Sequence, residues 1–92
     1  MSAADQTVKP RLAAGCRWTE ANGDERTLLF PEGAIVLRGT GRDILERCDG
    51  ESTVHEIVEA LQAKYGAGDP ARIAQDVASF LEQLQQKRIV DL

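Results

Sequence analysis

Side chains that could do acid–base or nucleophilic chemistry are few and scattered in this 92-residue chain. The single histidine, His55, falls in the first turn of a predicted helix, where a solvated polar side chain is commoner than a general base. Ser2, Ser52 and Ser79 lie outside the Gly-x-Ser-x-Gly pattern that exposes a nucleophilic serine. We therefore expect no catalytic residue and no enzyme activity.

The two cysteines, Cys16 and Cys48, could bind a metal or form a disulfide. Their spacing is not that of a zinc site, and one histidine cannot complete an ordinary ligand set. The glycines fall in predicted turns and form no phosphate-binding pattern. We expect no metal and no cofactor, and two free, partly buried thiols, with a disulfide as the alternative.

Composition indicates one small globular domain. The chain is 42% hydrophobic and 28% charged, with a formal net charge of -4. A mild acidic balance argues against nonspecific binding to nucleic acid or anionic membranes. Residues 1–9 lack the apolar core of a signal peptide, and no apolar run reaches transmembrane length. We expect a flexible N-terminal tail over residues 1–9, a single domain over residues 10–92, and a cytoplasmic location.

The first half of the chain predicts strands joined by tight turns. The expected strands, rich in alternating or β-branched apolar residues, are 15–20, 26–30 and 34–37. Asn22-Gly23 favours a hairpin turn because both positions accept positive φ. In Pro31-Glu32-Gly33, Pro presets φ and Gly allows a positive φ, which predicts the second turn.

The second half has helical periodicity. Thr40 is the predicted cap of a first helix that ends at Asp49-Gly50. Thr53 to Glu56 reads as a capping box for a second helix, which Gly66-Ala67-Gly68 breaks, and Asp69-Pro70 begins the third. The two longer helices carry apolar stripes made of Val54, Ile57, Val58, Leu61 and Tyr65, and of Ile73, Val77, Phe80, Leu81 and Leu84.

The order of elements predicts an α+β fold, with a three-stranded antiparallel sheet followed by three helices. Ile89-Val90 is a candidate last strand. The last two helices, joined by a short glycine-containing turn, are typical of the helix-turn-helix half of a winged-helix fold.

Several segments in this order resemble the PqqD family. They are Gly15 with Arg17-Trp18, Leu28 to Gly33, Ile44-Leu45 with Cys48-Asp49-Gly50, Thr53-Val54 with Glu56-Ile57-Val58, and Asp76-Val77 with Phe80-Leu81. The resemblance implies a peptide chaperone of pyrroloquinoline quinone (PQQ) biosynthesis. Such a protein binds the precursor peptide PqqA and presents it to the radical S-adenosylmethionine enzyme PqqE. The same fold serves as a leader-peptide recognition domain.

The resemblance also implies where the peptide binds. The peptide would add as a strand beside residues 34–38 and lie against the third helix. Its groove would be formed by Ala34, Ile35, Val36, Leu37 and Arg38 on one side and by Ile73, Asp76, Val77, Phe80 and Leu81 on the other. Strand addition is physically reasonable because a free sheet edge offers unpaired backbone groups.

Other interpretations of the same residues stay open at this stage. The apolar positions of the third helix could be core, and either face of the strand over residues 34–37 could meet the helices. Asp76 could be solvated, pair with Arg72, or hold a basic peptide residue. A winged-helix DNA-binding protein and a structural dimerisation domain are the alternative functions. We expect a monomer or weak homodimer that binds no nucleic acid.

Overall fold

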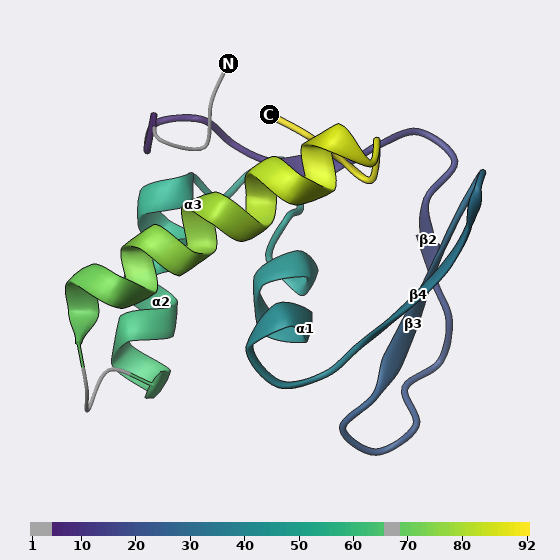
Figure 1. The fold of residues 1–92 in the computed structure, drawn as a ribbon, viewed down its shortest axis with the longest axis horizontal. Helices are drawn as coiled ribbons and strands as arrows, with labels where there is room; N and C mark the ends of the chain where they lie inside the picture. Colours follow the sequence, from purple (N-terminus) through teal and green to yellow (C-terminus); the bar gives the residue numbers. More distant parts are fainter. Residues whose placement is uncertain (1–4, 66–68) are drawn as a thin grey trace.

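The computed structural model describes residues 5–65 and 69–92. In chain order the elements are β1 (Arg11–Leu12), β2 (Arg17–Trp18), β3 (Arg26–Phe30), β4 (Gly33–Leu37), α1 (Gly39–Glu46), α2 (Val54–Tyr65), α3 (Pro70–Gln86) and β5 (Val90–Asp91). The helices gather on one side and the sheet of β2, β3 and β4 stands on the other (Figure 1). The predicted α+β class is confirmed. The helix-turn-helix likeness stays a prediction, because residues 66–68 of the turn lie outside the described residues.

The three-stranded sheet is an antiparallel meander in the order β2-β3-β4. Phe30 pairs with Gly33, so the second turn is centred on Pro31-Glu32 and Gly33 already belongs to β4. In the first hairpin the closing pair is Asn22 with Glu25, and Gly23 has φ 62. The prediction that Asn22 and Gly23 form the turn was therefore wrong by one residue. Of these two residues, only Gly23 has the expected positive φ.

The register decides which face of β4 meets the helices. Leu28, fully buried, lies opposite Ile35, and Arg26 lies opposite Leu37. Leu37 is 5% exposed, whereas Val36 is 52% exposed. Since side chains alternate along a strand, Ile35 and Leu37 face the core and Val36 faces solvent.

α1 differs from its prediction at both ends. Its N-cap is Arg38, without a side-chain cap, and not Thr40. The reason is Gly39, whose φ of 56 turns the chain directly from β4 into the helix. The helix ends at Glu46, before Asp49-Gly50. Gly50 uses its φ of 79 in the following loop, where its N–H donates to the Pro10 carbonyl.

The N-termini of the longer helices follow the sequence signals. Thr53 Oγ1 accepts from the Glu56 N–H at 3.1 Å, and Glu56 Oε1 accepts from the Thr53 N–H at 2.9 Å, which is a complete capping box. Asp69 accepts from the N–H groups of Ala71 and Arg72, and Pro70 occupies the first helical position. The predicted helix break at residues 66–68 lies outside the described part of the chain.

The N-terminal segment is packed from an earlier point than expected. Val8 is 6% exposed, and its carbonyl accepts from the Val54 N–H at 2.8 Å, while Pro10 is fully buried. β1 then pairs with β5, which confirms the candidate last strand. Residues 5–9 are thus part of the domain rather than of a tail, because they supply hydrogen-bond acceptors to the start of α2. Residues 1–4 of the predicted tail lie outside the described residues.

Candidate functional site

The outer edge of β4 is open to an added strand. In the described part of the chain β4 pairs only with β3. The Thr27 carbonyl accepts from the Thr19 N–H of the β2 side at 3.0 Å, so the backbone of Thr27 points away from β4. Its partner Val36 therefore belongs to a pair that exchanges no hydrogen bonds. By this alternation, the backbone N–H and C=O groups of Ala34 and Val36 point to the free edge.

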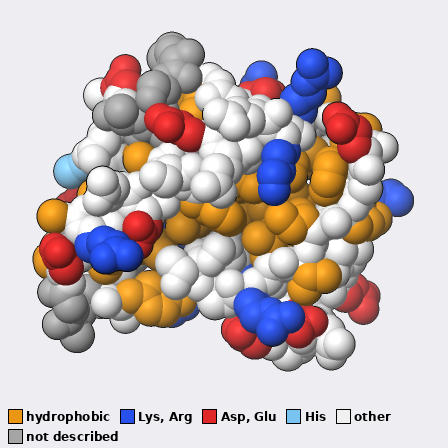
Figure 2. Space-filling view, in the orientation of Figure 1, with side chains coloured by type: hydrophobic (Ala, Val, Ile, Leu, Met, Phe, Trp, Pro, Cys, Tyr) orange, Lys and Arg blue, Asp and Glu red, His pale blue; other side chains and the backbone are white. Residues whose placement is uncertain are grey.

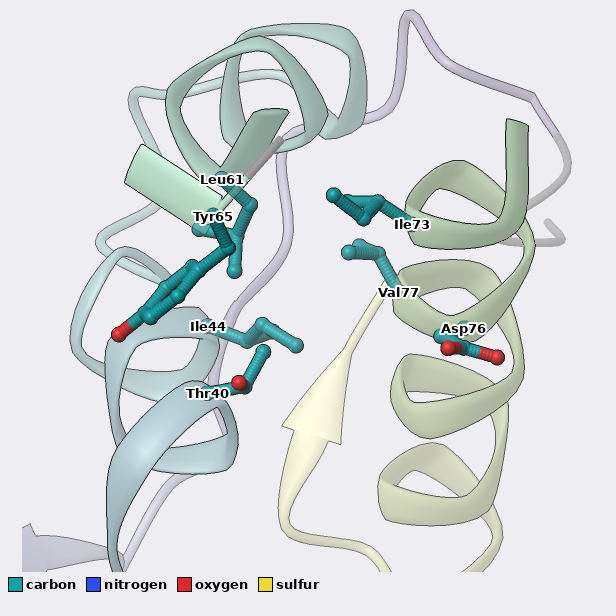
Figure 3. Close-up of a pocket in the computed structure, with 7 residues that line it drawn as sticks. All are labelled: Thr40, Ile44, Leu61, Tyr65, Ile73, Asp76 and Val77. Atoms are coloured by element: carbon teal, nitrogen blue, oxygen red, sulfur yellow. The ribbon is translucent and has the colours of Figure 1, made fainter. Parts of the chain in front are cut away.

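A hollow of about 410 Å³ lies among the three helices. Figure 3 shows Ile44 of α1 and Leu61 of α2 facing Ile73 and Val77 of α3 across this space. We call it the helix pocket; its lining is Thr40, Ile44, Leu61, Tyr65, Ile73, Asp76 and Val77. The lining is mostly aliphatic, so the helix pocket suits an apolar side chain.

A second, more open hollow of about 600 Å³ adjoins the helix pocket. We call it the outer pocket; its lining is Thr40, Gly41, Ile44, Asp76 and Phe80. Three residues, Thr40, Ile44 and Asp76, line both hollows. In Figure 2 hydrophobic side chains form a band across the centre of this face, between the helices and the sheet. The two pockets together form one apolar groove.

Gly41 keeps the outer pocket open. A Cβ atom at Gly41 would lie 3.4 Å from Phe80 Cζ and 3.7 Å from Leu37 Cδ2. The bare glycine lets the Phe80 ring rest over the first turn of α1. A larger side chain at residue 41 would occupy the space between α1 and α3.

The structure brings part of the predicted groove together. Ile73, Asp76, Val77 and Phe80 line the pockets. On β4, Ala34 and Val36 are exposed and Ile35 is half-buried, and Arg38, just after the strand, is exposed. Leu37 and Leu81 are buried in the core, at 5% and 0% exposure, and are not among the residues that line either pocket. The structure therefore reports only where the predicted groove residues lie. Their role in peptide binding stays a prediction.

Sequence reasoning missed the contribution of α1 and α2 to the groove. The missed lining residues are Thr40, Gly41, Ile44, Leu61 and Tyr65. Ile44 and Leu61 were expected only as core, and Tyr65 was expected on the buried stripe but is 39% exposed. The closely spaced Gly39 and Gly41 were the available signal, since two glycines around a helix start indicate close approach of another element.

α1 is fixed between the sheet and α2 by charged side chains. Arg26 Nη1 of β3 lies 2.7 Å from Glu46 Oε2, and Arg42 Nε lies 3.3 Å from Glu46 Oε1. Asp43 Oδ2 accepts from Lys64 Nζ at 2.9 Å and from the Tyr65 hydroxyl, both at the end of α2. These contacts hold the α1 wall of the groove in place relative to the sheet and α2.

The Asp43 contact is reflected in the acidity of its members. Partial burial raises the pKa of Asp43, but the hydrogen bonds from Tyr65 and Lys64 outweigh it, and the pKa lies below its usual value. The same hydrogen bond to Asp43 raises the pKa of Lys64 and that of Tyr65. Asp43 is therefore an anion held by a cation and a hydroxyl at neutral pH.

The groups capable of catalysis are not assembled at the groove. Burial raises the pKa of the Cys48 thiol to about 12, and it raises that of Cys16, so both resist forming a thiolate nucleophile. His55 is exposed and lies 3.0 Å from Glu59 Oε1 on the same helix. Over residues 5–65 and 69–92 no cluster of three His, Cys, Asp or Glu residues is placed to hold a metal. None of the helices in these ranges is both long and apolar enough to cross a membrane.

The fold and the site define a small α+β domain that has an open strand edge and an apolar groove, two features of domains that take up a peptide as an extra strand. Comparison with known proteins gives the family. The family model described as "Coenzyme PQQ synthesis protein D (PqqD)" matches residues 25–90, and the chain belongs to this family. The resemblance found in the sequence is thereby confirmed.

Relatives and a solved structure agree with this assignment. A protein of Xanthomonas axonopodis pv. citri named PqqA binding protein is 32% identical, and the match covers 100% of both chains. A PqqA binding protein of Methylococcus capsulatus is 41% identical over 72% of this chain and 67% of its own length. The solution structure of the PqqD part of Methylobacterium extorquens PqqCD superposes with a TM-score of 0.72 at 34% identity, covering 90% of this chain and 88% of that one. That structure is described as a stand-alone recognition element for ribosomally synthesised, post-translationally modified peptides.

Proposed function

We propose that this protein is a peptide chaperone of PQQ biosynthesis, which binds the precursor peptide PqqA by strand addition to β4 and presents it to the radical S-adenosylmethionine enzyme PqqE. Relatives matched along their whole length carry the name PqqA binding protein. The related solved structure is described as a recognition element for peptides of this kind. Both of these arguments for peptide binding come from relatives, and the structure adds a physical argument of its own.

The observation that carries the proposal is the open edge of β4, a strand whose last residue, Leu37, meets the first turn of α1 at the same point as Phe80 of the groove: a Cβ atom at Gly41 would lie 3.7 Å from Leu37 Cδ2 and 3.4 Å from Phe80 Cζ. Ala34 and Val36 each offer one outward N–H and one outward C=O, and a pairing strand gains ~0.5–1.5 kcal/mol net for each hydrogen bond formed. Immobilising a peptide costs on the order of 4–15 kcal/mol. Backbone pairing alone is therefore marginal. An apolar side chain seated in the helix pocket or the outer pocket adds roughly 1.5–3 kcal/mol, which makes binding favourable.

Strand addition is also compatible with presentation to a second enzyme. A peptide paired with β4 uses one backbone edge and keeps the other edge and both ends free. The segments outside the groove stay accessible to an enzyme that modifies the same peptide. In this arrangement the domain supplies affinity and direction, and PqqE supplies the chemistry.

The test is a titration of isotope-labelled protein with synthetic PqqA, followed by backbone NMR. We expect saturable shifts at Ala34 to Arg38 and at Ile73 to Phe80. Val36→Pro removes the outward N–H without breaking a hydrogen bond to β3. It should therefore abolish the shifts caused by PqqA, while the spectrum of the free variant still shows a folded protein. Val36→Thr keeps the N–H and is the matched control.

Two results would count against the proposal. An absence of shifts at high excess of PqqA would reject peptide binding itself. Equal affinity of Val36→Pro and Val36→Thr would reject strand addition at β4 while leaving the groove as the contact surface. Presentation is tested separately, by asking whether PqqE modifies PqqA faster with wild-type protein than with Val36→Pro.

A further inference from the structure

Asp76 is the one charged side chain that lines the two pockets. The other lining residues are aliphatic, aromatic, glycine or threonine. Asp76 stands where the helix pocket and the outer pocket meet, since it lines both. The Asp76 side chain is 65% exposed, so it is open to a cation that a bound peptide brings, and the peptide itself would shield the pair from water.

Two cations of other elements are held by other carboxylates. Lys64 Nζ lies 2.9 Å from Asp43, and Arg38 Nη2 lies 2.9 Å from Glu25. Among residues 5–65 and 69–92, the ion-pair partner of Asp76 is Arg72, whose Nε is 3.7 Å from Oδ1, beyond hydrogen-bonding distance. The two side chains are 73% and 65% exposed, so their ion pair contributes little. Asp76 is thus available for a closer cation.

We infer that the segment of the precursor peptide held in the groove combines an apolar side chain with a neighbouring Lys or Arg, and that Asp76 selects this cation. The inference rests on the proposed function, because it names the chemistry of the peptide at the same groove. The methylene stem of a Lys or Arg can lie along Ile73 and Phe80 while its charged end reaches Asp76. The apolar neighbour fills the helix pocket.

This arrangement gives Asp76 a role in specificity rather than in folding. Its side chain is exposed on α3, so removing its charge leaves the core intact. A peptide without a cation at this point loses the ion pair, and a peptide with an acidic residue there meets repulsion.

The experiment is a double-mutant cycle between protein and peptide. Fluorescein-labelled PqqA, and variants in which each Lys or Arg in turn is replaced by norleucine, are titrated against wild-type protein and Asp76→Asn. We expect Asp76→Asn to weaken binding of unmodified PqqA by roughly twofold to fivefold. One norleucine variant should weaken binding to wild type equally and show no further loss with Asp76→Asn. Glu59→Gln removes the same charge from the exposed face of α2 and should leave the affinity unchanged.

Arg72 provides a second arm with the opposite sign. Arg72→Gln removes the ion-pair partner that the structure gives Asp76, and with it a positive charge that would repel the peptide cation. It should tighten binding of PqqA in wild type, and less so in the Asp76→Asn background. Weaker binding on Arg72→Gln would mean that the groove holds an acidic peptide residue, which overturns the inference.

The outcomes separate the two proposals. Saturable binding with equal affinity for wild type and Asp76→Asn overturns the cation inference and leaves the proposed function standing. The same conclusion follows if no norleucine variant couples to Asp76. An absence of PqqA binding to wild-type protein rejects the proposed function and the inference together.

Discussion

The apolar stripe of α3 has two sides with different surroundings. On one side, Val77, Leu81 and Leu84 are 1%, 0% and 2% exposed, and β5 folds back against the helix. On the other side, Ile73 and Phe80 stay half-buried and line the pockets. The periodicity that forms the helix is the same for both sides, so the difference comes from what the rest of the chain covers. A binding groove here is the part of a core-forming stripe that no other element covers.

The largest expected effect tests the division between the two sides of the α3 stripe directly. Leu81→Ala should lower the free energy of unfolding by ~2–5 kcal/mol, because it opens a cavity in a fully buried site. Phe80→Ala, one residue earlier, should cost less stability since its ring is already half-exposed. It should instead weaken PqqA binding by roughly tenfold or more, as an apolar anchor site is lost. Urea denaturation and peptide titration of both variants make the comparison.

The comparison would fail if the two variants behaved alike. Equal losses of stability would place Phe80 in the core. Unchanged affinity of folded Phe80→Ala would remove the outer pocket from the binding site. Leu84→Ala is a matched control for Leu81→Ala, since it lies on the same buried side of the helix.

The same contrast explains what could be predicted from the sequence. The stripe on α3 gave the helix and its inward side, and the capping box and Asp69-Pro70 gave the helix starts, because these signals are local. Which stripe residues stay uncovered depends on where α1 lies, and α1 is placed by distant contacts such as Asp43 with Lys64 and Tyr65. Tyr65 was expected to be buried because its spacing continues the apolar stripe of α2. In the structure its hydroxyl instead donates to Asp43 at the surface.

Strand pairing shows the same limit. The β-branched residues of the apolar run 34–37 predicted a strand, but both of its faces are apolar, so only the register with β3 decides that Ile35 and Leu37 point inward. The role of Val8 was invisible in the sequence, because its contact is a backbone hydrogen bond to the start of α2. Periodicity in the sequence indicates local conformation, whereas contacts between distant segments decide which side chains are buried.

A smaller effect is expected at the packed end of α3. The helix ends in a Schellman motif, in which the Ile89 N–H donates to the Leu84 carbonyl and the Arg88 N–H donates to that of Gln85. Arg88 has φ 61, a left-handed conformation that strains residues with a Cβ. Arg88→Gly should therefore raise the free energy of unfolding by about 1 kcal/mol without altering PqqA binding. Arg88→Ala removes the same charge but keeps the Cβ, so thermal denaturation should show no comparable gain.

A substitution at Gly41 in the groove should give a gain in stability of similar or smaller size, together with weaker peptide binding. Gly41→Ala should stabilise α1 by roughly 0.5–1 kcal/mol, because alanine favours helix interiors. The new methyl group contacts Phe80 and narrows the outer pocket, so PqqA affinity should fall. A stability gain together with unchanged affinity would show that the peptide does not enter the outer pocket. Arg88→Gly serves as the comparison, since it stabilises the same helix bundle away from the groove.

The smallest effect concerns the pH dependence of the contact that positions α1. The folded-state pKa of Asp43 lies below its ordinary value of 3.8, because Tyr65 and Lys64 hydrogen-bond to the carboxylate. A lowered folded pKa means that the contribution of Asp43 to stability is present above that ordinary value and is lost as the pH falls through the folded pKa. Asp43→Asn should therefore be less stable than wild type near pH 7, and the difference should shrink at about pH 3 in urea denaturation. Glu32→Gln, in the exposed β3–β4 turn, removes the same charge and should show no such convergence. If the Asp43→Asn deficit stays constant with pH, α1 is held by packing rather than by this anion, and the groove wall does not depend on the charge of Asp43.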